Sequence, residues 1–86
     1  MKGVFLVQID ENIQDFELIE VESSNIKKIK YLFKSKSMVV EFNNSIKYEY
    51  FDVTYDLFNS IAKSTSVGKA FDSIIRKGNF RYSKVV

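Results

Sequence analysis

The 86-residue chain contains no cysteine, no histidine, no proline and no tryptophan. Without cysteine the chain has no disulfide and no thiol nucleophile, and without histidine it has neither a Cys/His zinc site nor imidazole acid–base chemistry. Carboxylates could still act as acid and base, but no pair of acids stands beside a nucleophile or a set of metal ligands. We therefore expect no enzymatic activity, no metal and no cofactor.

Long apolar runs are also absent. The longest, VFLV, is far below the ~18 residues that suggest a membrane span. No charged segment followed by a long apolar run stands at Met1, so no signal peptide is expected. The lack of cysteine is compatible with a reducing compartment. Together these absences predict a cytoplasmic location and no membrane partner.

A hydrophobic fraction of 45% and an aromatic fraction of 15% indicate a packed core, and the length allows one domain over residues 1–86. Charge is unevenly distributed within it. Residues 1–26 carry six acids and one lysine, whereas residues 63–86 carry six basic residues and one acid. The basic end is suited to an anion such as nucleic acid, or it pairs with the acidic start of the same molecule.

Alternation of apolar and polar residues predicts an antiparallel meander of three to four strands. The clearest strands are residues 26–33, 37–42 and 46–51, with turns at 23–25, 34–36 and 43–45. Residues 3–9 and 16–22 are further strand candidates, and residues 79–86 form a short strand or tail. In the 16–22 segment the alternation slips between Leu18 and Ile19, so two registers are possible.

The period then changes to that of helices, at residues 54–63 and 64–78. Thr54 is a suitable N-cap for the first helix, Thr65 or Ser66 for the second, and Gly78 for the second helix's C-terminal end. We predict an α+β fold with both helices on one face of the sheet.

Tyr48 and Tyr50 share a predicted strand face with Ile46. If the helices cover that face, both tyrosines belong to the core or to its edge. If the face is open, they form a platform on which bases stack. The opposite face is predicted to be a solvated ladder of charges, formed by Lys28, Lys30, Glu41, Lys47 and Glu49.

Two further groups could bind phosphate. The start of the second helix offers Ser66, Gly68 and Lys69, although Ser66 could simply cap the helix. The C-terminal end offers basic residues interleaved with Phe80 and Tyr82, although these charges also favour the helix dipole and an Asp72–Arg76 pair. The predicted binding residues are Ser66, Gly68, Lys69, Arg76, Lys77, Arg81, Tyr48 and Tyr50.

The chain contains a set of short motifs: Ser23-Ser24-x-Ile26, Tyr48-x-Tyr50, Val53, Ser66-x-Gly68-x-x-Phe71, Ile75-Arg76 and Phe80-Arg81-Tyr82. Together they resemble the pattern of the KTSC domain, named after the C-terminus of some lysyl-tRNA synthetases. The resemblance covers about residues 18–85 and leaves residues 1–17 as an acidic arm or an extra strand. The chain departs from the family pattern at Ser45, where glycine is usual, and at Asp72, where asparagine is usual.

The resemblance implies a stand-alone KTSC domain of the kind found in bacteria and phages, for which RNA binding has been suggested. We therefore expect a small non-enzymatic module that binds RNA or another nucleic acid. The alternative is a protein-binding module, such as a phage-type inhibitor of a host or defence complex. The acidic arm favours this alternative, because it would repel nucleic acid and suit a basic protein surface.

Overall fold

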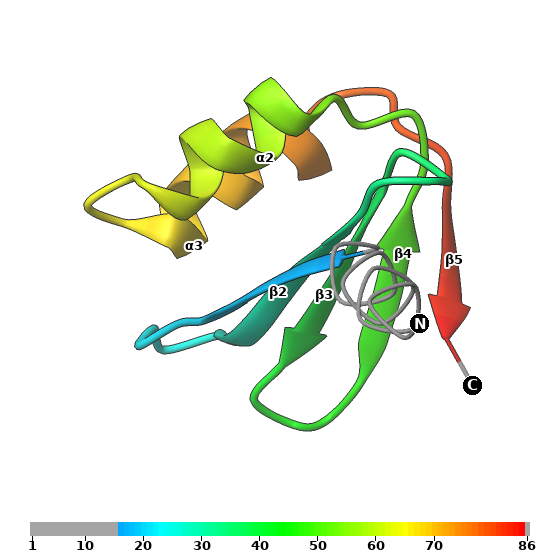
Figure 1. The fold of residues 1–86 in the computed structure, drawn as a ribbon. Helices are drawn as coiled ribbons and strands as arrows, with labels where there is room; N and C mark the ends of the chain where they lie inside the picture. The colour runs from blue at the N-terminus through cyan, green and yellow to red at the C-terminus, as the bar shows by residue number, and fades with distance from the viewer. Residues whose placement is uncertain (1–15, 86) are drawn as a thin grey trace, which may run out of the picture.

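A computed structural model describes residues 16–85. Within this range, five antiparallel strands lie in the order β1-β2-β3-β4-β5, with α2 and the continuous segment formed by α3 and η1 on one face (Figure 1). The bounds are β1 Phe16–Glu20, β2 Ile26–Leu32, β3 Ser37–Phe42, β4 Lys47–Tyr50, α2 Tyr55–Ala62, α3 Val67–Phe71, η1 Asp72–Arg76 and β5 Tyr82–Val85. The predicted α+β class is confirmed, with five strands instead of three or four. The candidate strand at residues 3–9 lies outside the described residues.

Two rows of side chains cross the helix side of the sheet in register. The first row is Glu17, Tyr31, Met38, Tyr50 and Tyr82, and the second is Ile19, Ile29, Val40, Tyr48 and Lys84. The middle of each row is buried, whereas Tyr82 and Lys84 on β5 are exposed. The helices therefore cover the centre of the sheet and stop short of β5, as Figure 1 shows.

The core lies between this face and the helices. Its fully buried members are Ile26, Ile29, Met38, Val40, Val53, Phe58, Ile61 and Ile75. Tyr31 is also buried, and its hydroxyl donates a 2.7 Å hydrogen bond to the carbonyl oxygen of Val53. This bond satisfies a polar group that burial would otherwise penalise, and it ties β2 to the segment that leads into α2.

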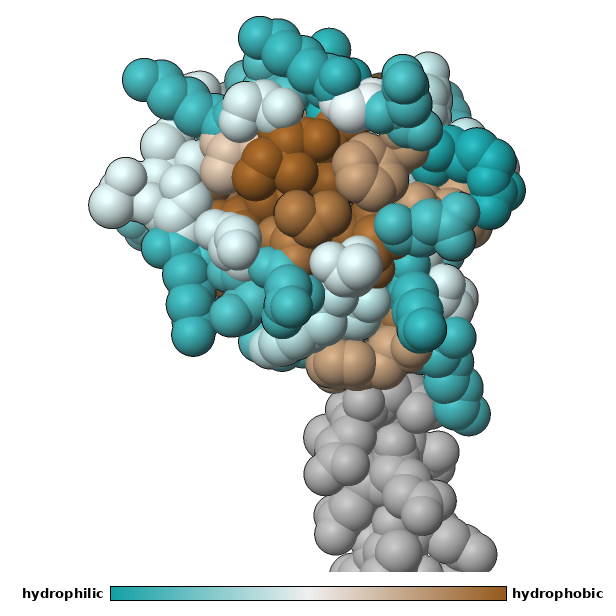
Figure 2. Space-filling view, turned by 90° about the horizontal axis from the view of Figure 1, so that it is seen from above, coloured by the Kyte–Doolittle hydropathy of each residue, from teal (hydrophilic) through white to brown (hydrophobic). Residues whose placement is uncertain are grey.

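The first helix begins as predicted, because the Thr54 hydroxyl accepts a 3.2 Å hydrogen bond from the Leu57 amide. Apolar residues of the helical layer are not all covered: Leu57, Ala70 and Ile74 are only half-buried. Figure 2, seen from above the helices, shows an apolar patch ringed by polar side chains. No helix described within residues 16–85 has the length and hydropathy to cross a membrane.

The second predicted helix is not α-helical throughout. Ser66 caps it as expected, and its hydroxyl accepts a hydrogen bond from the Lys69 amide. The α-helix ends at Phe71 and continues as a π-helical turn, in which the Lys77 amide donates to the Asp72 carbonyl five residues before it. Such turns are rare and occur frequently at functional sites. The spacing of apolar residues does not distinguish an α-helix from a π-helical turn here, because it predicts burial of Phe71 and Ile75 and both are buried.

Gly78 does not end this helix in the predicted way. None of the glycines within the described residues has a positive φ, so Gly78 is not a left-handed C-cap. Glycine is needed at this position because a side chain would collide with neighbouring atoms. A Cβ at this position would lie 2.7 Å from the Ile74 carbonyl oxygen and 2.9 Å from the Phe80 ring.

The ambiguous register of β1 is resolved by burial. Ile19 is half-buried against the core, whereas Phe16 and Leu18 are exposed on the opposite face. On that outer face Glu41 lies between Lys28 and Lys47 in the cross-strand register, as predicted, although the ion pair that Glu41 makes is with Lys27, at 3.9 Å.

The central hairpin turn contains a strained residue. Ser45 has φ 70°, in the left-handed region, at the position where the family pattern has glycine. We expect Ser45→Gly to stabilise the fold by up to about 1 kcal/mol, because relief of a left-handed conformation outweighs the entropy that glycine adds to the unfolded chain. Urea denaturation measures this gain.

Asn44→Gly is the matched control for that substitution. It adds the same flexibility to the turn but removes the hydrogen bond that the Asn44 side chain accepts from the Ile46 amide at 3.1 Å. We expect this variant to lose stability. Equal stability changes in the two variants would contradict the assignment of strain to Ser45.

Candidate functional site

Two hollows lie on either side of Arg76. The first is a groove of about 780 Å³ between the β1–β2 turn and the start of α3, and it extends along η1. The second is a pocket of about 440 Å³ between η1 and the β4–β5 edge of the sheet. Arg76 lines both. Because the helices stop short of β5, the aromatic rings of that edge form a wall of the second pocket.

The groove is shaped by a close contact between two separate motifs. The Ser23 hydroxyl accepts hydrogen bonds from the amides of Asn25 and Ile26, at 3.2 and 3.4 Å, which fixes the β1–β2 turn. A Cβ on Gly68 would lie 3.2 Å from that same hydroxyl oxygen. The glycine therefore lets α3 approach this turn closely.

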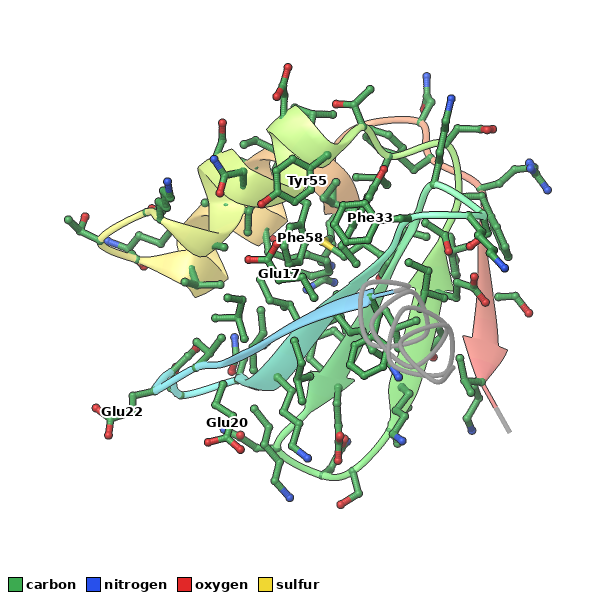
Figure 3. The ribbon with its side chains drawn as sticks, in the orientation of Figure 1. Glu17, Glu20, Glu22, Phe33, Tyr55 and Phe58 are labelled. Atoms are coloured by element: carbon green, nitrogen blue, oxygen red, sulfur yellow. The ribbon has the colours of Figure 1, made fainter. Side chains whose placement is uncertain are left out.

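The charges of the groove are divided between its walls. Glu20 and Glu22 lie on the β1 side, and Figure 3 shows them near the end of the β1–β2 hairpin. Lys69, Arg76 and Lys77 lie on the helix side. An anionic ligand would thus be repelled at the hairpin end and attracted toward the Arg76 end, next to the second pocket.

Asp72 is the counterion of the basic wall. Its carboxylate lies 3.5 Å from Arg76 Nη1 and 3.7 Å from Lys77 Nζ, and all three side chains are exposed. The π-helical turn spans Asp72 to Arg76, and Lys77 follows directly. The predicted Asp72–Arg76 pair is confirmed.

The second pocket, here called the tyrosine pocket, is lined by Phe42, Tyr48, Tyr50, Ile75, Arg76, Gly78, Phe80 and Tyr82. Tyr50 is 7% exposed and forms its floor, whereas Tyr82 is 63% exposed and forms its outer wall. The Tyr82 ring lies 5.6 Å from the Tyr50 ring and 5.8 Å from the Tyr48 ring, at 35° and 72°. Burial raises the pKa of the Tyr50 phenol, and the Arg76 guanidinium opposes part of this rise.

The sequence-predicted residues divide among three places. Ser66, Gly68 and Lys69 line the groove with Arg76 and Lys77, and Tyr48 and Tyr50 line the tyrosine pocket. The prediction that the tyrosines belong to the core or its edge is confirmed, with Tyr50 in the core and Tyr48 half-buried beside it.

Arg81 is not brought together with the others. Its guanidinium lies 4.9 Å from the centre of the Phe51 ring and 3.5 Å from the Asp52 carboxylate, and it lines neither hollow. The predicted binding set omitted Tyr82 and Phe80, which the structure places in the tyrosine pocket. Their spacing near the C-terminal end was the available signal, but only the pairing of β5 with β4 puts Tyr82 beside Tyr50, and Phe80 lies just before β5.

The predicted acidic arm is described only in part. Asp10, Glu11 and Asp15 lie outside the described residues, so pairing of the arm with the basic end stays a prediction. Glu17 is engaged elsewhere, because its carboxylate accepts a 2.8 Å hydrogen bond from the Tyr55 hydroxyl. Figure 3 shows this pair beside Phe33 and Phe58, and the hydrogen bond to Glu17 raises the pKa of Tyr55.

The five-stranded meander, its two helical segments and the contact between the Ser23 turn and Gly68 define a small α+β module. The family model of the KTSC domain matches residues 22–82. The chain therefore belongs to the KTSC domain family, as its motifs predicted.

Similar proteins have been found at the level of both sequence and structure. Lysine–tRNA ligases from Nostoc punctiforme and Trichormus variabilis are each 31% identical to the chain over 85 residues, covering 95% of the chain. The chain spans only 15% of the length of these ligases. The crystal structure of a KTSC domain protein from Yersinia pestis matches with a TM-score of 0.75 and 27% identity, covering 83% of the chain and 99% of that protein.

Proposed function

We propose that this KTSC module is a non-enzymatic RNA-binding domain that holds single-stranded RNA along the side of η1. The observation that carries the proposal is the position of Arg76, which lies between a groove with a basic wall and a pocket with aromatic walls. Single-stranded nucleic acid is generally bound by this combination of cations that follow the phosphates and rings that stack on the bases.

The relatives add support of a different kind. The lysine–tRNA ligases that match the chain are named for a tRNA substrate, so a module shared with them is suited to contact with RNA. A non-catalytic role agrees with the lack of cysteine and histidine in the chain. Within residues 16–85, no three acidic side chains come close enough together to hold a metal ion.

Titration of fluorescently labelled single-stranded RNA tests the proposal. We expect saturable binding that Arg76→Ala with Lys77→Ala weakens by ~10-fold, with a log–log salt slope lower by about 1.4, since each single-strand phosphate contact contributes ~0.7. The control is Lys28→Ala with Lys47→Ala, which removes the same charge from the outer face of the sheet. Equal losses in the two double variants would indicate attraction to net charge alone. No saturable binding would contradict the proposal and leave the protein-binding alternative.

Removal of the counterion Asp72 is expected to strengthen RNA binding. Asp72→Asn, which restores the residue usual in the family, frees both Arg76 and Lys77. We expect RNA affinity to rise about two- to thirtyfold, since two exposed ion pairs are lost and each is worth ~0.2–1 kcal/mol.

Asp52→Asn is the matched control for the Asp72 substitution. Asp52 pairs with Arg81 away from both hollows, and asparagine tolerates its positive φ of 59°. The control removes the same charge but frees no cation beside the groove, so its affinity should change little. A rise in affinity as large as that of Asp72→Asn would place the RNA near Arg81 instead.

A further inference from the structure

Resting on the proposed function, we propose that the tyrosine pocket takes one unpaired nucleobase of the bound strand, stacked against Tyr82. Its volume of about 440 Å³ falls within the ~300–1,000 Å³ typical of small-ligand sites. The pocket has a firm floor, because Tyr50 and Ile75 are buried, and an open side at the 63%-exposed Tyr82. Small planar ligands suit a cavity of this form.

Among the three tyrosines of the pocket the exposed ring is that of Tyr82, since Tyr50 is 7% exposed and Tyr48 is half-buried. Tyr48 lies at 46° to Tyr50, Tyr82 at 72° to Tyr48, and Tyr82 at 35° to Tyr50, so no two of them are stacked in parallel. A base that enters the pocket can therefore stack on the exposed Tyr82 ring without displacing a parallel tyrosine partner.

The phenol hydroxyls of the pocket are also available. Two other tyrosines use theirs within the fold, since Tyr31 donates to Val53 and Tyr55 donates to Glu17. For the hydroxyls of Tyr48, Tyr50 and Tyr82, residues 16–85 supply no hydrogen-bond partner, and none of the three is a buried unsatisfied group. These hydroxyls can donate to or accept from the polar edge of a base.

Charge favours a nucleotide over an uncharged ring. Arg76 lines the pocket on the helix side, and Lys84 stands on the sheet side, in cross-strand register with Tyr48. Lys84 is exposed on β5 and is not part of the pocket lining, so a strand that places one base in the pocket can meet Arg76 there and Lys84 on the neighbouring edge of the sheet. This complementarity distinguishes a base in a strand from an apolar molecule or an aromatic side chain of a protein.

The test compares an RNA oligonucleotide with the same oligonucleotide carrying abasic residues, which keep the phosphates and lose the bases. We expect Tyr82→Ala to weaken binding of the intact RNA by about 5- to 150-fold, the range that stacking of one base gives. It should leave the salt slope unchanged, because stacking releases no counterion. Wild type and Tyr82→Ala should bind the abasic strand equally, and Tyr82→Phe should retain most of the affinity.

The control is Phe16→Ala, which removes an exposed aromatic ring from the outer face of the sheet. We expect it to bind both strands as the wild type does. If Arg76→Ala with Lys77→Ala weakens binding while Tyr82→Ala and the abasic strand do not, RNA binding stands and the base pocket is wrong. If no variant and no wild-type sample binds RNA, both proposals are wrong.

Discussion

Replacing Tyr50 by alanine is expected to destabilise the domain by about 3–5 kcal/mol, as truncation of a large core aromatic generally does. Tyr50 is 7% exposed, and its ring packs edge-on against Phe71 at 5.5 Å between centroids. A chain of 86 residues has roughly 4–13 kcal/mol of stability in total, so the loss takes up much of it. Urea denaturation of the wild type and the variant measures the difference.

Tyr48→Ala is the comparison for this experiment. Tyr48 is two residues away on the same face but only half-buried, at the border of the tyrosine pocket. We expect a loss of roughly 1–2 kcal/mol, within the common range for a single substitution. A Tyr50→Ala variant as stable as the wild type would contradict the placement of Tyr50 in the core and would leave the whole Tyr-x-Tyr pair free for binding.

Gly78→Ala is the second substitution with a large expected effect. Its new methyl group would lie 2.7 Å from the Ile74 carbonyl oxygen, which is backbone and cannot move away without disturbing the end of η1. We expect a loss of about 1–3 kcal/mol, typical of overpacking. Because the methyl group also meets the Phe80 ring at 2.9 Å, the tyrosine pocket should change shape and RNA affinity should fall.

Gly68→Ala is the matched control, since it makes the same change at the start of α3. Its methyl group would meet only the Ser23 hydroxyl, at 3.2 Å, and alanine favours the helix over glycine by up to ~1 kcal/mol. We therefore expect stability within about 1 kcal/mol of the wild type. The close approach inferred at Gly78 is wrong if the two alanine variants melt at the same temperature.

The meander was predictable because β2, β3 and β4 alternate cleanly and their turns carry suitable residues. Ile29, Val40 and Tyr50 all point to the helices as their alternation indicated. The register of β1 was not predictable, because it carries apolar residues on both faces. Its Phe16 and Leu18 are as apolar as Ile19, and only pairing with β2 decides which of them are buried.

Other features depend on contacts that no local pattern encodes. The π-helical turn leaves the apolar stripe of its helix in place, so the sequence could not distinguish it from an α-helix. Strand β5 is exposed along its whole length, and its pairing with β4 defines it, not burial. The predicted binding set lacked Tyr82, because only the pairing of β5 with β4 places this residue beside Tyr50.

The question of whether the Tyr-x-Tyr pair serves the core or a ligand thus has a divided answer. Tyr50 serves the core, and Tyr48 stands at the border where the helices end. The uncovered part of the sheet face is its β5 edge, with Tyr82 exposed and Arg76 opposite. The binding surface that we propose is therefore the edge of the helix-covered face.

The most direct test is an amide chemical-shift map of ¹⁵N-labelled protein titrated with single-stranded RNA. The account predicts that the perturbed amides gather around Arg76, in η1 and the residues that follow it, and on the β4–β5 edge at Tyr48 and Tyr82. The outer-face strand positions of Lys28 and Lys30 should be unaffected. Perturbations confined to that outer face, or an unchanged spectrum at saturating RNA, would contradict it.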